Sequence, residues 1–150
     1  MSFSSKVKAE LLSHISTGRH CRMAELAAMI VMSGEYRDGV WTMRGENTIL
    51  QEKITKLTTL LGVNINTPDG RQMLKLIDYG DYLSVNPILV ERSCCKQAFI
   101  RGAFLATGSL TDPEKGYHFE IVCDHAVKQM EDITYIEQTK GLKYLPEHLQ

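Results

Sequence analysis

The sequence of 150 residues predicts an α+β fold organised around two apolar helices that resemble each other. The first helix lies in residues 24–35 and the second in residues 98–109, and a glycine ends each one. Segments with strand-like patterns lie between and after them. The second helix carries Gly102 at its centre, which costs roughly 1 kcal/mol relative to alanine. Close approach of another helix would explain this glycine, so we expect the two helices to cross.

The two helices can be aligned as an internal repeat by superposing their terminal glycines. Ala28 then falls on Gly102, and Ser33 falls on Thr107. Small residues at matching positions allow two helices to pack closely about a pseudo-twofold axis. This partial repeat is the second observation behind the predicted fold class.

The first half of the chain is expected to contain three helices and one strand. Ser5 and Asn47 are favourable N-caps, and Gly62 is a favourable C-terminal stop. Apolar residues between these signals recur at the helical period, and a short alternating stretch indicates a strand. The expected elements are helices at 5–15, 20–32 and 47–61, a turn at 36–39 and a strand at 40–44.

The second half is expected to contain more strands. Turn-forming residues at 66–70 predict a hairpin, and Ser93 is a favourable cap for the second apolar helix. Asp124 can start a last long helix with an imperfect apolar stripe. The expected elements are strands at 63–65, 73–77 and 117–122 and helices at 94–107 and 124–139.

Composition and charge narrow the functional classes. The chain is 43% hydrophobic and 23% charged, which is typical of a folded domain rather than a disordered chain. No apolar run approaches the ~18 residues that span a membrane, and Lys6, Lys8 and Glu10 interrupt any signal-peptide core. We therefore expect a cytoplasmic protein that does not enter a membrane. Because the net charge is −1, DNA contact requires a local basic patch or a missing partner domain.

Six side chains are of the types that bind soft metals, but their spacing is uninformative. No Cys-x-x-Cys or His-x-x-x-His pair occurs among them. The sequence therefore predicts no metal site and no cofactor, and reduced thiols are the expected state in the cytosol. The six residues are His20, Cys21, Cys94, Cys95, Cys123 and His125.

Several stretches are similar to a known bacterial family. They are Met1 to Ser5, Cys94-Cys95, Arg101 to Ala106, Gly108-Ser109, Asp112 to Lys115 and Tyr117 to Val122. Together they resemble the WhiA family, which are regulators of sporulation and cell division. The two apolar helices also resemble the LAGLIDADG helices of homing endonucleases, of which the WhiA domain is a non-catalytic version.

The resemblance implies a fold, a domain division and a function. The fold is LAGLIDADG homing-endonuclease-like, with two signature helices packed on a curved antiparallel sheet. Residues 1–123 would form this domain with an incomplete second repeat, and residues 124–150 resemble the helical linker that follows it in the family. The family's C-terminal helix-turn-helix domain is expected to be absent. The implied function is a DNA-binding or interaction scaffold in transcription regulation, with DNA and the transcription machinery as partners.

Two other functions remain open on the sequence, namely a metal-dependent homing-endonuclease relative and a degenerate remnant that only oligomerises. An active endonuclease of this fold ends each signature helix in a carboxylate that holds a divalent metal. The aligned positions here are Ser33 and Thr107. Because neither hydroxyl ionises at neutral pH, we expect no catalytic residue and no enzyme activity.

Basic residues near the starts of the two helices are the candidate DNA contacts. Related by the pseudo-twofold axis, they could form one positive edge, although ordinary solvated helix ends are the alternative interpretation. A strand face containing Trp41 and Met43 could add to this surface. The candidates are Arg19, Arg22, Arg44, Arg92, Lys96 and Arg101.

An incomplete second repeat would leave a strand edge and an apolar face uncovered. Such surfaces favour association. We therefore expect two chains to pair as a homo-oligomer, through the helix predicted at 124–139.

Overall fold

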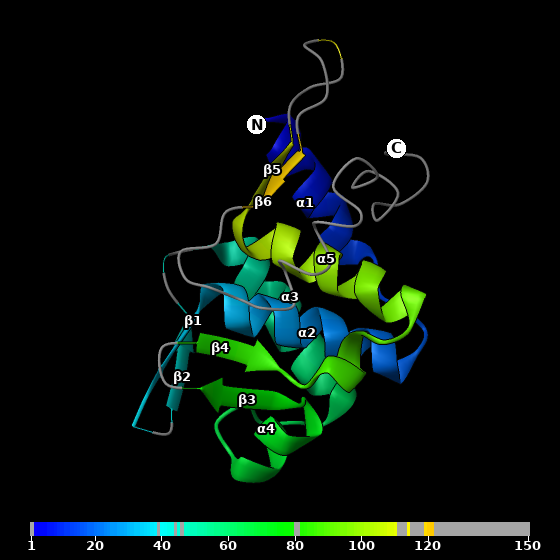
Figure 1. The fold of residues 1–150 in the computed structure, drawn as a ribbon. Coiled ribbons are helices and arrows are strands. Elements are labelled where there is room, and N and C mark those ends of the chain that lie inside the picture. Colours follow the sequence, from blue (N-terminus) through cyan, green and yellow to red (C-terminus); the bar gives the residue numbers. More distant parts are fainter. Residues whose placement is uncertain are drawn as a thin grey trace.

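The computed structural model describes residues 2–38, 40–43, 45, 47–79, 82–110, 114 and 119–121. Helices and antiparallel strand pairs make up this part of the chain, so the predicted α+β class is confirmed (Figure 1). The elements in order are α1 (Phe3–Ser13), α2 (Arg19–Ser33), β1 (Gly34–Arg37), β2 (Val40–Met43), α3 (Thr48–Leu61), α4 (Pro68–Met73), β3 (Leu76–Tyr79), β4 (Tyr82–Val85), η1 (Pro87–Val90), α5 (Ser93–Thr107), β5 (Gly108–Leu110) and β6 (Phe119–Ile121).

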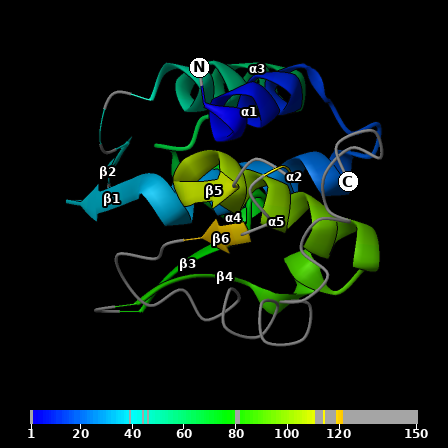
Figure 2. The same ribbon diagram turned by 90° about the horizontal axis from the view of Figure 1, so that it is seen from above.

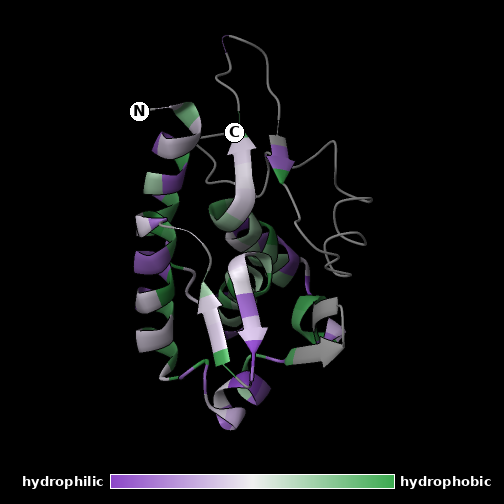
Figure 3. Cartoon of the chain, turned by 90° about the vertical axis from the view of Figure 1, so that its left-hand side faces the viewer, coloured by the Kyte–Doolittle hydropathy of each residue, from purple (hydrophilic) through white to green (hydrophobic). Residues whose placement is uncertain are grey.

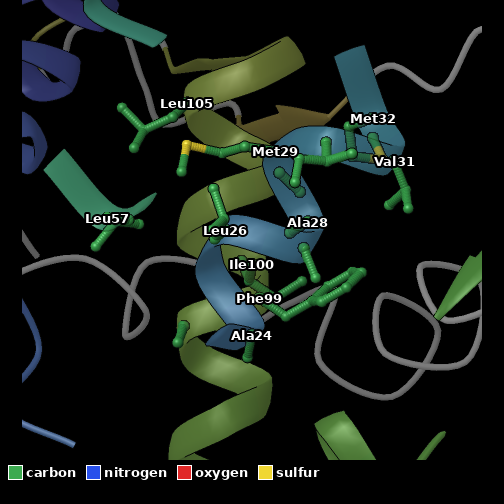
Figure 4. Packing of buried hydrophobic residues seen from close by; sticks show 14 of the residues in the cluster. Ala24, Leu26, Ala28, Met29, Val31, Met32, Leu57, Phe99, Ile100 and Leu105 are labelled. Atoms are coloured by element: carbon green, nitrogen blue, oxygen red, sulfur yellow. The ribbon is translucent and has the colours of Figure 1, made fainter. Parts of the chain in front are cut away.

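The core of the molecule is the pair of helices α2 and α5. These two helices share the most extensive contact between described elements, and their apolar side chains interlock (Figure 4). Every residue of α2 from Ala24 to Ser33 is buried, which differs from the single apolar stripe of a surface helix. Helices α1 and α3 cover one side of the pair, and the β3–β4 hairpin covers the other (Figure 2).

Gly102 is the point of closest approach between the two helices. A Cβ atom at this position would lie 2.2 Å from the carbonyl oxygen of Glu25 on α2 and 3.0 Å from the Cβ of Ala28. No side chain can be accommodated so close to a backbone oxygen. The prediction that the mid-helix glycine marks a helix crossing is therefore confirmed.

The two halves share the same order of helix and hairpin. Helix α2 passes through Gly34 directly into β1, and α5 passes through Gly108 directly into β5. Both glycines are extended, with φ of −87°. Each lies opposite the last residue of the partner strand, Met43 in β2 and Ile121 in β6. The glycines therefore end the two helices, as the sequence predicts, and each also starts a strand.

The described strands form three separate two-stranded antiparallel sheets. They are β1–β2, β3–β4 and β5–β6. The β3–β4 hairpin aligns Leu76 with Val85. Within the described ranges, the curved sheet expected from the resemblance is thus divided into three pieces around the helix pair.

Several local predictions are confirmed. Asn47 caps α3, because its side chain accepts a hydrogen bond from the amide of Leu50 at 3.0 Å. Gly62 ends that helix in the left-handed conformation, with φ of +67°. Strand β2 has the expected alternation, with Trp41 buried and Val40 and Thr42 exposed.

Other local predictions are wrong. The residue that caps α1 is Ser2 and not Ser5. The side chain of Ser2 accepts a hydrogen bond from the amide of Ser5. Ser93 lies inside α5 and makes no cap; the N-cap position is Arg92. Residues 63–65 form no strand, and α4 occupies most of the predicted turn. Thr67 explains this helix because its hydroxyl accepts from the amide of Gly70 at 3.0 Å. Strand β3 then pairs with β4 instead of with residues 63–65.

Hydropathy follows the layered arrangement. The hydrophobic colour concentrates on the central helices and on the inward sides of the outer ones (Figure 3).

No helix within the described ranges has the length and apolar character needed to cross a membrane. The helix predicted at 124–139 lies outside the described residues, as does the domain boundary predicted at 123.

Candidate functional site

The C-terminal ends of α2 and α5 carry the two positions that hold carboxylates in an active endonuclease. Ser33 is 6% exposed at the end of α2. Thr107 ends α5, and its hydroxyl donates a hydrogen bond to the carbonyl oxygen of Ala103 at 3.4 Å. Glu35, one residue into β1, is engaged in an ion pair with Arg37 at 2.5 Å. Neither of the two aligned positions therefore supplies an anionic oxygen.

The N-terminal ends of α2 and α5 lie in contact with each other. The Nε2 atom of His20 lies 3.4 Å from the Sγ atom of Cys94, although the two residues are 74 positions apart. Because the starts and the middles of the helices are both in contact, the helices run in the same general direction. The basic residues predicted near the two starts are thus brought to one end of the helix pair.

Three of those basic side chains make contacts inside the molecule. Arg19 donates to the carbonyl oxygen of Leu61 at 3.1 Å. Arg22 donates to the carbonyl oxygen of Ser16 at 2.7 Å, and Arg101 donates to the hydroxyl of the same serine at 3.1 Å. Ser16 therefore connects the segment between α1 and α2 to both helices of the central pair.

The other predicted contacts differ from these three. Arg92 is exposed and Lys96 is half-buried at the start of α5. Within the described ranges, neither side chain has a hydrogen-bond or ion-pair partner. Arg44 lies outside the described residues. Arg92 and Lys96 are thus the predicted contacts whose charged groups are not engaged elsewhere in the described structure.

Trp41 does not belong to an exposed strand face. It is only 3% exposed, and its ring packs against Tyr36 with 5.2 Å between the ring centroids. The prediction that this face presents Trp41 to DNA is wrong, because the indole is part of the core beneath the β1–β2 hairpin.

The contact between the helix starts contains four side chains that we call the thiol–imidazole cluster: His20, Cys21, Cys94 and Cys95. Their potential ligand atoms all lie within 4.8 Å of one another. Cys21 and Cys95 are buried, whereas Cys94 is exposed. Burial raises the pKa of the Cys21 thiol, and burial together with the neighbouring thiols raises the pKa of Cys95 to about 12.

A buried ion pair lies beside the helix crossing. The Nζ atom of Lys53 on α3 is 3.3 Å from the Oε1 atom of Glu25 on α2, and neither side chain reaches solvent. Lys53 also donates to the carbonyl oxygen of Leu11 at 2.6 Å and to that of His14. Burial lowers the pKa of Lys53 and raises that of Glu25, while their mutual attraction opposes both shifts.

Sequence comparisons relate this geometry to known proteins. The profile of the WhiA LAGLIDADG-like domain matches residues 96–141. The chain is 35% identical over 156 residues to the probable cell division protein WhiA of Lachnoclostridium phytofermentans, covering 81% of this chain and 50% of that protein. The probable cell division protein WhiA of Lachnospira eligens is 34% identical over 157 residues, with coverage of 83% and 50%.

Two solved structures share the fold of this chain. The crystal structure of the N-terminal LAGLIDADG domain of a WhiA protein matches 95% of this chain and 74% of its own, with a TM-score of 0.58 and 21% identity. Full-length WhiA from Thermatoga maritima matches 95% of this chain and 50% of its own, with a TM-score of 0.64 and 19% identity. The chain carries the LAGLIDADG-like domain of the WhiA family.

This WhiA-type chain spans about half the length of the curated relatives it matches. Helices α2 and α5 are its two LAGLIDADG-type helices, as the resemblance implied. The predicted fold is therefore confirmed, and the chain belongs to the WhiA family at the level of this domain.

The thiol–imidazole cluster of this WhiA-type domain could not be predicted from the spacing of its residues in the sequence. Its members are separated along the chain, but they occupy equivalent positions in the repeat. His20 and Cys94 are the second residues of α2 and α5, and Cys21 and Cys95 are the third. The register of the repeat was thus the signal that could have joined them. For Lys53 the available signal was its place among Leu50, Ile54 and Leu57 on the apolar stripe of α3.

Proposed function

We propose that this chain acts as a non-catalytic DNA-binding scaffold in a WhiA-type regulator of cell division and sporulation genes. The observation that carries the proposal is the difference between the two ends of the α2–α5 pair. One end holds hydroxyls where an endonuclease needs carboxylates, and the other end holds basic side chains. We infer that the protein works in the cytoplasm and that the transcription machinery is a further partner.

The chemistry at Ser33 and Thr107 supports the proposed lack of nuclease activity. Metal-assisted hydrolysis of a phosphodiester needs anionic oxygen ligands for the divalent ion. A neutral hydroxyl does not replace them. We expect no nicking of supercoiled plasmid in the presence of Mg²⁺, and nicking that depends on these two positions would support the endonuclease alternative instead.

DNA contact would depend on a small number of charges. The net charge of −1 gives no general attraction to phosphate, so the contribution of Arg92 and Lys96 becomes decisive. They lie at the start of α5, beside the first turn of α2 with Arg19 and Arg22. Because Arg19 and Arg22 are already engaged internally, the binding should be weak and should fall steeply with salt.

A gel-shift titration over several salt concentrations tests this function. We expect the R92A/K96A double variant to bind promoter-rich bacterial DNA more weakly than the unmodified chain. Each lost phosphate contact reduces the slope of log K against log salt by about 0.9, so the slope should fall by roughly two. The matched control is K6A/K56A, which removes the same charge from exposed sites on α1 and α3.

Three results would contradict the proposal. The unmodified chain could fail to bind DNA even at low salt. The R92A/K96A variant could keep both its affinity and its salt slope. The control variant could lose as much binding as R92A/K96A, which would mean that DNA affinity depends on net charge and not on these two positions.

We also propose that two copies of the chain associate. Each of the three described sheets has only two strands, so each strand has one edge without a sheet neighbour within the described ranges. Exposed strand edges favour pairing with another chain. Val40 on β2 and Ile88 on η1 add exposed apolar side chains, at 45% and 54% exposure.

A further inference from the structure

We propose that the thiol–imidazole cluster of His20, Cys21, Cys94 and Cys95 is a binding site for one Zn²⁺ ion, which joins the starts of α2 and α5. The observation behind the proposal is that the four potential ligand atoms lie within 4.8 Å of one another. The ion would have a structural role, because all four coordination positions would be filled by protein side chains.

The donor set fits zinc. Three cysteine sulfurs and one histidine nitrogen form one of the ligand combinations found in structural zinc sites. With the usual zinc–sulfur and zinc–nitrogen bond lengths, tetrahedral coordination places neighbouring ligand atoms about 3.6–3.8 Å apart. The distance of 3.4 Å between His20 Nε2 and Cys94 Sγ is close to this value. Small adjustments of the side chains would complete the tetrahedron.

The internal repeat explains how adjacent residues can form one site. Two consecutive residues on a helix point about 100° apart, so a single helix turn cannot surround an ion with them. Here α2 supplies its second and third residues, and α5 supplies its own second and third residues. The pseudo-twofold relation between the helices places these two pairs face to face, and this gives four ligands around one point.

Burial raises the pKa of the Cys21 and Cys95 thiols, so the charge of the bound ion must stabilise the thiolates, and the two helix starts add to this effect. No side chain caps the first turn of either helix, since Gly18 and Arg92 make no cap hydrogen bond. The free amides and the helix dipoles therefore direct positive potential toward the cluster. Three thiolates, one neutral imidazole and Zn²⁺ together carry one negative charge, which this potential and the nearby Arg101 guanidinium would balance.

The cluster lies at the protein surface on one side and against the core on the other, so an ion could reach it from solvent and be surrounded by protein once bound. Cys94 is exposed, so the ion can enter from solvent. Cys21 and Cys95 are buried at the ends of the interlocked core. Binding transfers the three thiol protons to solvent, and it therefore becomes stronger as pH rises.

A cobalt titration of the reduced 150-residue chain tests the site. Co²⁺ in a tetrahedral thiolate site gives strong visible bands and a thiolate-to-cobalt charge-transfer band in the near ultraviolet. We expect these bands to saturate at one Co²⁺ per chain and to disappear when Zn²⁺ is added. Zn²⁺ should also raise Tm, because a ligand that binds only the folded state stabilises it.

Variants at the accessible ligands make the test specific. We expect C94S and H20Q each to weaken Co²⁺ binding by more than about 100-fold, the upper range for loss of even an outer-shell group. The matched control is C123S, which changes the remaining cysteine and should bind normally. Circular dichroism of each apo variant verifies that a loss of binding is not a loss of folding.

Other outcomes would overturn the proposal. The reduced protein could give no cobalt bands, or the bands could survive in C94S and H20Q. Binding could be lost in C123S, which would assign a different set of ligands. A disulfide that forms between cluster cysteines in air, together with no metal binding after reduction, would identify a redox pair instead.

Discussion

At the scale of single residues, Lys53 is a charged side chain that is completely buried. It faces the Glu25 carboxylate and two carbonyl oxygens at the C-terminal end of α1, those of Leu11 in the last turn and of the C-cap residue His14. These oxygens belong to the negative end of a helix dipole. Lys53 thus joins α1, α2 and α3 at one point, and both its charge and its hydrogen bonds are needed there.

Replacement of this lysine gives a prediction about stability. K53M leaves the Glu25 charge buried without its partner, and this should lower the free energy of unfolding by about 3–5 kcal/mol. The double variant E25Q/K53M removes both charges and should recover a substantial part of the loss. Urea unfolding followed by circular dichroism measures both values. If the double variant were less stable than K53M by the full cost of E25Q alone, the two residues would not be coupled.

The role of a residue could be predicted from the sequence when its partners are close to it along the chain, and not when they are distant. Asn47 and Gly62 were predictable because a cap depends on a few neighbouring amides and on local backbone angles. The role of Lys53 was not, because its partners come from α1 and α2, 28 or more positions away. The thiol–imidazole cluster combines both cases, since its residues were recognised as ligands but their meeting required the helix crossing.

At the scale of elements, the crossing of α2 and α5 depends on the absence of one methyl group. Alanine in place of a mid-helix glycine normally stabilises a helix by roughly 1 kcal/mol. At Gly102 we expect the opposite sign, because the new Cβ would lie 2.2 Å from the Glu25 carbonyl oxygen. The helices would have to separate along much of their shared surface.

Thermal unfolding of G102A measures this effect. We expect a loss of at least about 2 kcal/mol, within the range of overpacked cores. The K56A substitution on the exposed face of α3 is the control for a change to alanine in a helix and should be nearly neutral. Equal or greater stability of G102A would contradict the close approach described for this crossing.

Helices could be predicted from the sequence where the periodic pattern of apolar residues extends over many positions. Helices α2, α3 and α5 each present many apolar positions at the helical period. Strands β1 and β5 were missed because they are short and continue directly from glycines that resemble helix stops. Helix α4 was missed because Thr67 and Pro68 can begin either a turn or a helix, and the sequence alone does not distinguish them.

At the scale of the whole molecule, the open strand edges lead to a prediction about assembly. We expect light scattering at rising protein concentration to approach twice the chain mass of 16.9 kDa. The reason is that pairing of two copies would cover strand edges and exposed apolar side chains together. Dilution should restore the single-chain mass, and a single-chain mass at every concentration would refute the association.

The order in which the two central helices are made has a consequence for synthesis in the cell. Eleven of the fifteen residues of α2 are buried, largely against a helix about 74 positions later in the chain. At about 5–20 residues per second, the ribosome needs roughly 4–15 s to add that distance. During this interval the nascent α2 lacks its main partner. Folding of the core must therefore wait for the second half, and chaperone binding to the emerging first half would protect it from aggregation.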